Sequence, residues 1–266
     1  MICDKVIVRG GGDVASGTIQ KLYRSGFKVL VLETEKPTAI RRNVAFSEAV
    51  YEGETVVEGI KAVLANTPGE IETAFKNGVV PVAVDKEGRL IDILKPCTVV
   101  DGILAKRNLG TNRNMAPLTI ALGPGFYAGR DVDIVIETMR GHNLGRLIFE
   151  GYAMENTGMP GAIGGYTNER VIYSPGDGII KNINKIGDIV NKDDTIAHIG
   201  SLEVKAQITG LLRGIIRDET LVSRGLKIAD IDPRVKEINN YNSISDKARC
   251  IGGGVLEAIL MMNNKK

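Results

Sequence analysis

The chain has 266 residues, a formal net charge of +2 and no tryptophan. Apolar residues make up 43% and charged residues 25%, which is ordinary for a globular protein and leaves no basic stripe for nucleic acid. The length allows two domains, or one domain with an insert. No stretch is apolar enough to span a bilayer and the first residues lack a signal-peptide pattern, so we expect a cytoplasmic protein without membrane or nucleic-acid partners.

The first 34 residues predict a strand, a helix and a second strand. Residues 4–8 and 28–33 are apolar runs, and between them Ala15, Ile19 and Leu22 share one helical face because they fall at i, i+4 and i+7. Further strands are expected at residues 61–65, 79–84, 89–94, 117–122 and 132–138, with a helix at 67–78. Alternating strands and helices predict an α/β class, with a Rossmann-like, mostly parallel, doubly wound sheet over residues 1–165.

After Tyr166 the helical pattern stops and an internal repeat begins. Residues 178–199 and 210–231 align without a gap at a spacing of 32 residues. Repeated short strands at this period predict a small all-β insert over residues 166–232, which resembles the barrel-sandwich fold of biotinyl and lipoyl domains. Helical periodicity then resumes with Ser245 as a candidate N-cap, so we expect residues 233–266 to return to the first domain.

The glycine loop after the first strand is a candidate phosphate site. Gly10, Gly12 and Ala15 fit a G-x-G-x-x-G/A pattern, and Glu33 ends the next strand, where a ribose-binding acid would lie. A tight turn without a ligand is the alternative. Asp13 would repel a bare pyrophosphate unless it faces solvent as a first-turn acid. The cofactor-binding residues expected here are Gly10, Gly11, Gly12, Asp13, Ala15, Ser16, Gly17 and Glu33.

A second glycine-rich cluster follows two later strands, at residues 122–131 and 137–146. Carboxyl ends of parallel strands meet at one edge of a sheet, where open α/β sheets bind ligands. We predict His142 and Arg140 as catalytic residues, with loop bracing as the alternative for His142. Gly123, Gly125 and Arg146 are further cofactor-binding candidates. The three cysteines have no CxxC spacing, so no metal site is predicted.

Eight motifs distributed over nearly the whole chain carry a family resemblance. They are "RGGGDVASGTIQKL", "AKRNLGT", "ALGPGFYAGRDV", "ETMRGHNLGR", "NTGMPG", "GLLRGII", "GLKIADIDPR" and "ISDKARCIGGGVLEAIL". Together they resemble the selenium-dependent molybdenum hydroxylase accessory family (YqeB type), which is distantly similar to the xanthine dehydrogenase accessory (XdhC-like) proteins. The resemblance implies a maturation role in handling or modifying a metal cofactor, with a molybdenum hydroxylase as client and a nucleotide or molybdopterin-type cofactor in the Rossmann-like pocket.

Two other functions compete with this expectation. The glycine loop and Glu33 also fit an NAD(P)-dependent oxidoreductase. A prosthetic-group carrier would need an exposed lysine at a hairpin tip, and the short linker around Lys205 leaves little room for one. A small phosphate-bearing ligand is expected in either of the first two cases, and a homo-oligomer is compatible with both.

Overall fold

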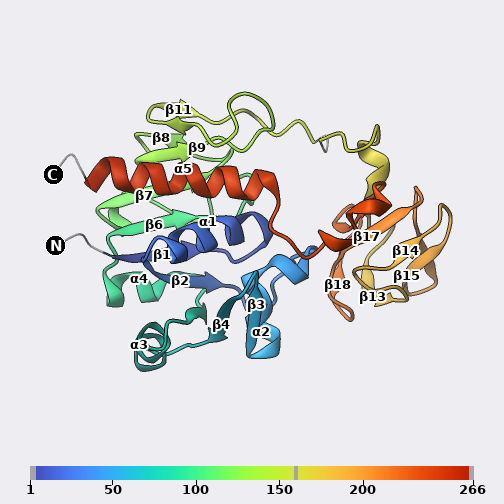
Figure 1. The fold of residues 1–266 in the computed structure, drawn as a ribbon, viewed down its shortest axis with the longest axis horizontal. Coiled ribbons are helices and arrows are strands. Elements are labelled where there is room, and N and C mark those ends of the chain that lie inside the picture. The colour runs from blue at the N-terminus through green and yellow to red at the C-terminus, as the bar shows by residue number, and fades with distance from the viewer. Residues whose placement is uncertain (1–3, 159–160, 264–266) are drawn as a thin grey trace. The chain divides into compact units, whose positions relative to one another are not determined.

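The computed structural model describes residues 4–158 and 161–263 and divides into two compact units (Figure 1). Unit 1 consists of Met1–Pro37, Ala45–Asn156 and Ile244–Lys266, and unit 2 of Thr38–Val44 and Thr157–Ser243. The chain therefore leaves unit 1, forms most of unit 2, and comes back to complete unit 1.

Unit 1 is built on a nine-stranded sheet with the order β10-β9-β7-β6-β1-β2-β5-β4-β3. In this order, every pair of neighbouring strands between β9 and β4 is parallel. The edge strands β10 and β3 pair antiparallel with β9 and β4. The strands are β1 (Lys5–Arg9), β2 (Lys28–Glu33), β3 (Glu54–Val57), β4 (Ile60–Leu64), β5 (Val80–Val84), β6 (Thr98–Asp101), β7 (Leu118–Leu122), β9 (Ile134–Ile136) and β10 (Leu147–Ile148). Two further short strands, β8 (Tyr127–Ala128) and β11 (Gly151–Tyr152), form a separate pair.

Alternating side chains of β1 divide the core of unit 1 into two layers. Ile7 belongs to a cluster with Ile71 of α3 and Leu90 of α4, whereas Val8 faces the side on which Ala15 of α1 packs. Helices therefore cover both faces around β1. The helices of the chain are α1 (Asp13–Arg24), α2 (Ala49–Glu52), α3 (Pro68–Lys76), α4 (Arg89–Leu94) and α5 (Asp246–Asn263). Short 3-10 segments are η1 (Arg42–Val44), η2 (Phe46–Glu48), η3 (Arg113–Met115), η4 (Asn168–Arg170) and η5 (Val235–Asn239).

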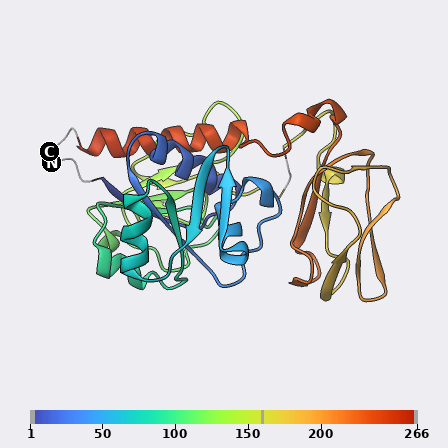
Figure 2. The ribbon, with the colours of Figure 1, turned by 60° about the horizontal axis from the view of Figure 1, so that its bottom comes forward.

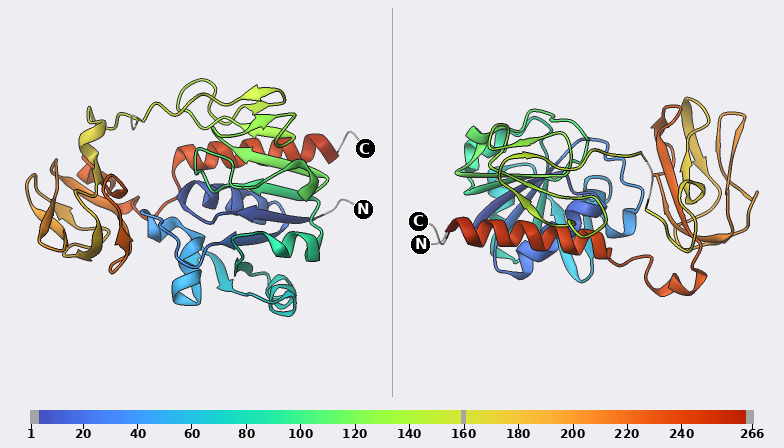
Figure 3. Two further views of the ribbon diagram at one scale, coloured as in Figure 1. Left: turned by 180° about the vertical axis from the view of Figure 1, so that it is seen from behind. Right: turned by 90° about the horizontal axis from the view of Figure 1, so that it is seen from above.

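Helix α5 lies beside α1 on the same face of the sheet (Figures 2 and 3). Two glycines allow this approach: a Cβ at Gly17 would collide with the Ala248 carbonyl oxygen, and one at Gly252 would lie 2.6 Å from the Gly17 oxygen. Ser245 caps the start of α5, because its Oγ accepts from the Ala248 N–H at 3.2 Å. Gly252 of α5 thus serves backbone-to-backbone packing, whereas a Cβ at Gly253 would meet nothing within 4 Å.

Unit 2 contains two four-stranded antiparallel sheets, ordered β12-β19-β17-β14 and β16-β15-β13-β18. The central strands of the first sheet, β19 and β17, come from the second copy of the repeat, and those of the second sheet, β15 and β13, come from the first copy. β14 of the first copy and β18 of the second copy each form an edge of the sheet whose centre belongs to the other copy. Apolar side chains of both sheets share one buried core. The strands are β12 (Val171–Tyr173), β13 (Gly178–Asn182), β14 (Ile189–Val190), β15 (Thr195–Ile199), β16 (Leu202–Lys205), β17 (Gly210–Ile215), β18 (Leu221–Val222) and β19 (Lys227–Asp232).

A buried ion-pair network crosses unit 2. Arg170 donates from Nη1 to Asp230 Oδ1 at 2.6 Å, and Arg213 donates from Nε to Asp230 Oδ2 at 2.8 Å. Arg234 binds both carboxylate oxygens of Asp232, at 3.0 and 2.8 Å. Asp230 and Asp232 are each 2% exposed, so these arginines compensate carboxylates that have lost their water.

The prediction of a Rossmann-like, doubly wound sheet with a barrel-sandwich-like insert is wrong. The structure is a mixed α/β fold, with a large, mostly parallel sheet plus separate antiparallel sheets. Residues 89–94 form α4 instead of a strand, because Asp85 accepts from the N–H groups of Gly88, Arg89 and Leu90 and starts a helix there. The connections from β6 through β7 to β9 contain no α-helix, so helices do not wind around that half of the sheet in chain order.

None of the helices in the described part of the chain combines the length and the hydropathy that crossing a bilayer requires.

Candidate ligand-binding site

The carboxyl ends of β1, β2, β5 and β6 lie together at one edge of the unit 1 sheet, because these neighbouring strands are parallel. The chain continues from β1 through α1 to β2 on one side, and reaches β6 on the other side of β1 only later. The connections therefore diverge between β1 and β6. In open α/β sheets, ligands bind outside the strand ends at such a point.

Gly10 and Gly11 are required by close packing within this edge. Gly10 has φ +91°, and a Cβ there would lie 3.0 Å from the Gly102 oxygen and from Ile103. A Cβ at Gly11 would lie 3.0 Å from the Ser47 nitrogen, which donates to the Gly11 oxygen at 3.0 Å. Both glycines thus let neighbouring loops approach the glycine loop.

Gly12 is different, because the space beside it is open. It is the N-cap of α1 in an extended conformation (φ −69°, ψ 178°), no side chain caps the helix there, and a Cβ would have no atom within 4 Å. Asp13 follows as a half-buried acid in the first turn. By contrast, α3 begins with a capping box in which Thr67 and Glu70 satisfy each other's backbone N–H groups. The N-terminus of α1 is therefore accessible to a ligand.

The next predicted residues of the loop have structural contacts. Ala15 is fully buried against Gly102, and Gly17 lies against α5. Ser16 is also fully buried; its Oγ donates to the Gly11 oxygen at 3.3 Å and accepts from the Phe46 N–H at 3.2 Å. These contacts explain the small side chains at the start of α1 without a ligand.

The Glu33 carboxylate connects the glycine loop to the end of β2. Oε1 accepts from the Gly11 N–H at 2.7 Å, and Oε2 accepts from the Thr34 N–H at 2.9 Å. Burial raises the pKa of the Glu33 carboxyl above its ordinary value, although both backbone hydrogen bonds act in the opposite direction. Both oxygens are thus engaged by the protein's own backbone, and Gly11 donates to Glu33.

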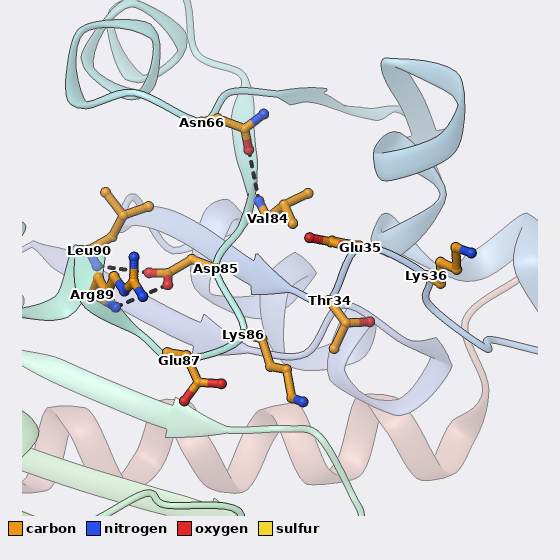
Figure 4. A pocket seen from close by; sticks show the side chains of 10 residues that line it. All are labelled: Thr34, Glu35, Lys36, Asn66, Val84, Asp85, Lys86, Glu87, Arg89 and Leu90. Carbon is orange, nitrogen blue, oxygen red and sulfur yellow. Dashed lines mark hydrogen bonds between the residues drawn. The ribbon is translucent and has the colours of Figure 1, made fainter.

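A cavity of about 760 Å³ opens next to Glu33, at the ends of β2 and β5 (Figure 4). Its volume is within the range of small-molecule sites. Asn66 Oδ1 accepts from the Val84 N–H at 2.8 Å and fixes one wall, while Asp85 fixes another by capping α4. The lining residues are Thr34, Glu35, Lys36, Asn66, Val84, Asp85, Lys86, Glu87, Arg89 and Leu90.

Buried polar side chains that the sequence analysis missed hold the loops of this edge in place. Arg9 donates to the Thr111 hydroxyl at 2.5 Å and to the Lys86 carbonyl at 3.0 Å, and Thr111 donates to Asp101 Oδ2 at 2.5 Å. Arg9, Thr111 and Asp101 are between 1% and 4% exposed. Burial raises the pKa of the Asp101 carboxyl, against the opposing effects of its Thr111 and Ile103 hydrogen bonds and the Arg9 charge. The sequence signals that could have identified this group are Arg9 at the end of β1 and Asp101 at the end of β6.

The second predicted cluster has two glycines in tight contacts. Gly123 has φ +78° and no room for a Cβ beside the Thr138 side chain. Gly125 has φ +111°, and a Cβ would lie 2.7 Å from the Arg107 nitrogen. Gly125 therefore supports the loop that follows β6.

Arg140, His142 and Arg146 belong to the loop between β9 and β10. The Arg140 guanidinium forms a bidentate pair with Asp246 of α5, at 2.8 and 2.9 Å. His142 and Arg146 are exposed, and within residues 4–158 and 161–263 neither side chain has a hydrogen bond or ion pair. This loop follows β9, which is separated from β1 by β7 and β6, so the strand spacing places it roughly 14 Å from the glycine loop. None of the three residues lines the cavity.

No grouping of three or more His, Cys, Asp or Glu side chains suited to a metal ion occurs in the described residues.

Comparison with known proteins gives one close sequence relative. No family model matches the chain. A curated protein of Escherichia coli (strain K12), named Uncharacterized protein YqeB, is 54% identical over 257 residues, which are 97% of this chain and 47% of the relative. The chain therefore spans about half the length of the curated relative that it matches.

Similar solved structures are more distant. They include the apo ectoine utilization protein EutE (DoeB) from Ruegeria pomeroyi (14% identity, TM-score 0.26, 85% of each chain) and an aspartoacylase family protein from Mesorhizobium loti (13%, 0.27, 85% of this chain and 84% of that chain). A succinylglutamate desuccinylase from Silicibacter sp. TM1040 is 11% identical, with a TM-score of 0.26 over 86% of this chain and 84% of that chain. Such TM-scores carry no argument about fold or activity.

These findings correct the resemblance to the selenium-dependent molybdenum hydroxylase accessory family. The curated relative has a name without an activity, so it gives no support to the maturation role that the resemblance implied. Nothing in the comparisons involves molybdenum or selenium. The chain is similar to a YqeB protein over nearly its whole length, but that similarity does not carry the maturation role.

Proposed function

We propose that unit 1 binds a small phosphate-bearing ligand of nucleotide size. The phosphate would lie at the N-terminus of α1, and the remainder of the ligand would occupy the adjacent cavity. The observation that carries this proposal is Gly12, an uncapped helix start with open space beside the Cα. A cavity of about 760 Å³ opens after Glu33, whose carboxylate accepts from the N–H of the preceding Gly11.

The physical basis is the set of unsatisfied N–H groups at a helix start. The first backbone bond of α1 runs from the Ser16 N–H to the Gly12 oxygen, at 2.9 Å, so the N–H groups before Ser16 point out of the helix end. The helix dipole adds partial positive charge at this position. Anions bind helix N-termini for these two reasons. Gly11 contributes less, because Glu33 already accepts its N–H.

The cavity suits a polar ligand with both donors and acceptors. Lys36, Lys86 and Arg89 bring positive charge, and Glu35 and Glu87 bring negative charge. Figure 4 shows the Glu35 carboxylate directed toward Val84. Arg9 holds the Lys86 carbonyl and directly precedes Gly10, so the cavity wall and the glycine loop are held by one side chain.

The alternative of an NAD(P)-dependent oxidoreductase gains no support. Glu33, which was predicted to bind a ribose, accepts one backbone N–H group on each carboxylate oxygen, from Gly11 and from Thr34, and this contact holds the glycine loop without a cofactor. His142 and Arg140 stay proposals for a separate role, since their loop does not line the cavity.

Calorimetric titration with AMP, ADP and NAD tests the proposal. We expect binding by the wild type and at least about tenfold weaker binding by Gly12→Val, because the valine would fill the phosphate position. The extended backbone of Gly12 accepts valine without strain, so Tm should not change.

The matched control is Gly69→Val, which also introduces a valine into open space at a helix start, in α3. It should leave the affinities unchanged. The proposal fails if the wild type binds none of the three nucleotides at millimolar concentration, or if Gly12→Val binds them as well as the wild type does.

A further inference from the structure

We propose that residues 104–107, named here the cationic loop, form a second arm of the anion site, with Lys106 and Arg107 binding the phosphate groups of the ligand. This inference rests on the proposed function and adds the residues that supply positive charge. It predicts a ligand with more than one phosphate, such as a nucleoside diphosphate.

The position of the cationic loop in the sheet supports this role. The cationic loop follows β6, the parallel neighbour of β1, across the point where the connections of the sheet diverge. Its base touches the glycine loop, since a Cβ on Gly10 would lie 3.0 Å from the Gly102 oxygen and from the Ile103 backbone. A ligand phosphate beside Gly12 would therefore lie between the two loops.

The backbone of the cationic loop is fixed in an unfavourable conformation. Leu104 and Lys106 have φ values of +60° and +61°, a region that L-residues with long side chains rarely adopt. Asp101 Oδ1 accepts from the Ile103 N–H at 3.1 Å on one side, and Gly125 packs against Arg107 on the other. Such conformations persist when the surroundings enforce them, and they cluster at ligand sites.

The positive charge of the cationic loop also supports this role. Lys106 and Arg107 are exposed, and in the part of the chain that the structure describes neither side chain has a hydrogen bond or ion pair. Arg9 and Arg140 of unit 1 are engaged, with Thr111 and Asp246, whereas Arg146 is exposed and without such a partner, as Arg107 is. Lys106 and Arg107 would offset the negative charge of Asp13 toward a bound phosphate. Lysine and arginine are the side chains that bind phosphate oxygens most strongly.

Titration of the full chain with ADP, AMP and adenosine tests the role of the cationic loop. In the double variant Lys106→Ala/Arg107→Ala we expect ADP affinity to fall at least about tenfold, AMP affinity to fall less, and adenosine binding to stay unchanged. The salt dependence of ADP binding should also weaken, because fewer charges contribute.

The matched control is Lys21→Ala/Arg24→Ala, which removes the same charge from the last turn of α1. That turn is roughly 16 Å from the helix start. This control should bind ADP within twofold of the wild type. Equal losses in the two double variants, or unchanged ADP affinity in Lys106→Ala/Arg107→Ala, would overturn the inference.

Lys106→Gly gives an independent readout. Glycine accepts φ +61° without strain, so Tm should rise by about 2–4 °C while ADP affinity falls. A lower Tm would assign Lys106 a structural role instead. Wild-type protein that binds no ADP, AMP or adenosine overturns both proposals. Wild-type ADP binding that is sensitive to Gly12→Val but not to loss of Lys106 and Arg107 overturns this one alone.

Discussion

In unit 2 the buried carboxylates of Asp230 and Asp232 are matched by arginines from the same unit, at 2.6 to 3.0 Å. In unit 1 a buried arginine and aspartate, Arg9 and Asp101, are joined through Thr111, but most charged side chains around the cavity and both of those in the cationic loop are exposed. The two units therefore differ in how they use charge: in unit 2 it compensates buried carboxylates, whereas the sheet edge of unit 1 adds exposed charges to a buried polar group. Removing one partner of a buried pair leaves a desolvated charge, whereas removing an exposed charge has little effect on stability.

The largest expected effect follows from breaking the network of unit 2. Asp230→Ala leaves Arg170, which is 6% exposed, without its carboxylate. We expect a loss of about 3–5 kcal/mol in the stability of unit 2. Thermal unfolding followed by circular dichroism measures this loss. Glu203→Ala, which removes an exposed pair with Lys205, is the control and should leave Tm unchanged. Equal Tm values for the two variants would show that the buried network is not stabilising.

A smaller effect is expected where the backbones of α1 and α5 touch in unit 1. Gly17→Ala places a methyl group against the Ala248 carbonyl, and the overpacking should cost about 1–3 kcal/mol. Gly253→Ala on α5 is the control, because a Cβ there meets nothing within 4 Å and alanine favours a helix by about 0.5–1 kcal/mol. Urea denaturation should therefore separate the two variants in opposite directions. A neutral Gly17→Ala would mean that α5 shifts freely on α1.

The smallest effect concerns an ion pair of unit 1, and it depends on pH. Burial alone would raise the pKa of the Glu58 carboxyl, but hydrogen bonds from Arg249, the Ile244 N–H and Gln20 outweigh it and lower the pKa below the ordinary 4.5. A lowered pKa contributes stability above pH 4.5 that is lost as the pH falls through the folded-state value.

We expect Glu58→Gln to lose about 1 kcal/mol at pH 7, since solvent screens the pair. The difference from the wild type should shrink toward pH 3, as measured by urea denaturation at both pH values. A difference that is the same at pH 7 and pH 3 would show that the carboxylate charge contributes nothing.

Local patterns predicted the elements whose causes are local. The helix at α1 follows from its apolar spacing, and α3 follows from Thr67 and Glu70 at capping positions. The prediction of a strand at residues 89–94 was wrong, because an apolar run does not reveal that Asp85 caps a helix there. The order of strands around β1 and the antiparallel edges depend on long-range pairing that periodicity does not contain.

The candidate site was predictable only in part. The glycine loop was found because three glycines between a strand and a helix are a local signal. The cavity was not found, since its lining comes from loops after β2, β4 and β5 whose charged residues look like ordinary surface. Glu33 was predicted to bind a ribose, whereas its contact with the Gly11 N–H depends on how two loops meet and could not be predicted. Ser16 and Gly17 were named from the loop motif. The residues that they contact, Phe46 and Ala248, lie on segments distant in sequence, so these contacts could not be predicted.

The position of α5 after unit 2 in the chain has a consequence for the order in which the protein folds during synthesis. Domains fold as units while the chain emerges from the ribosome. The face of α1 that Gly17 and Thr18 present to Gly252 stays uncovered until the whole of unit 2 has been translated. Unit 2 is by then complete, so it can finish folding before unit 1 does. Synthesis of α5, and not synthesis of the sheet, is the event that completes unit 1.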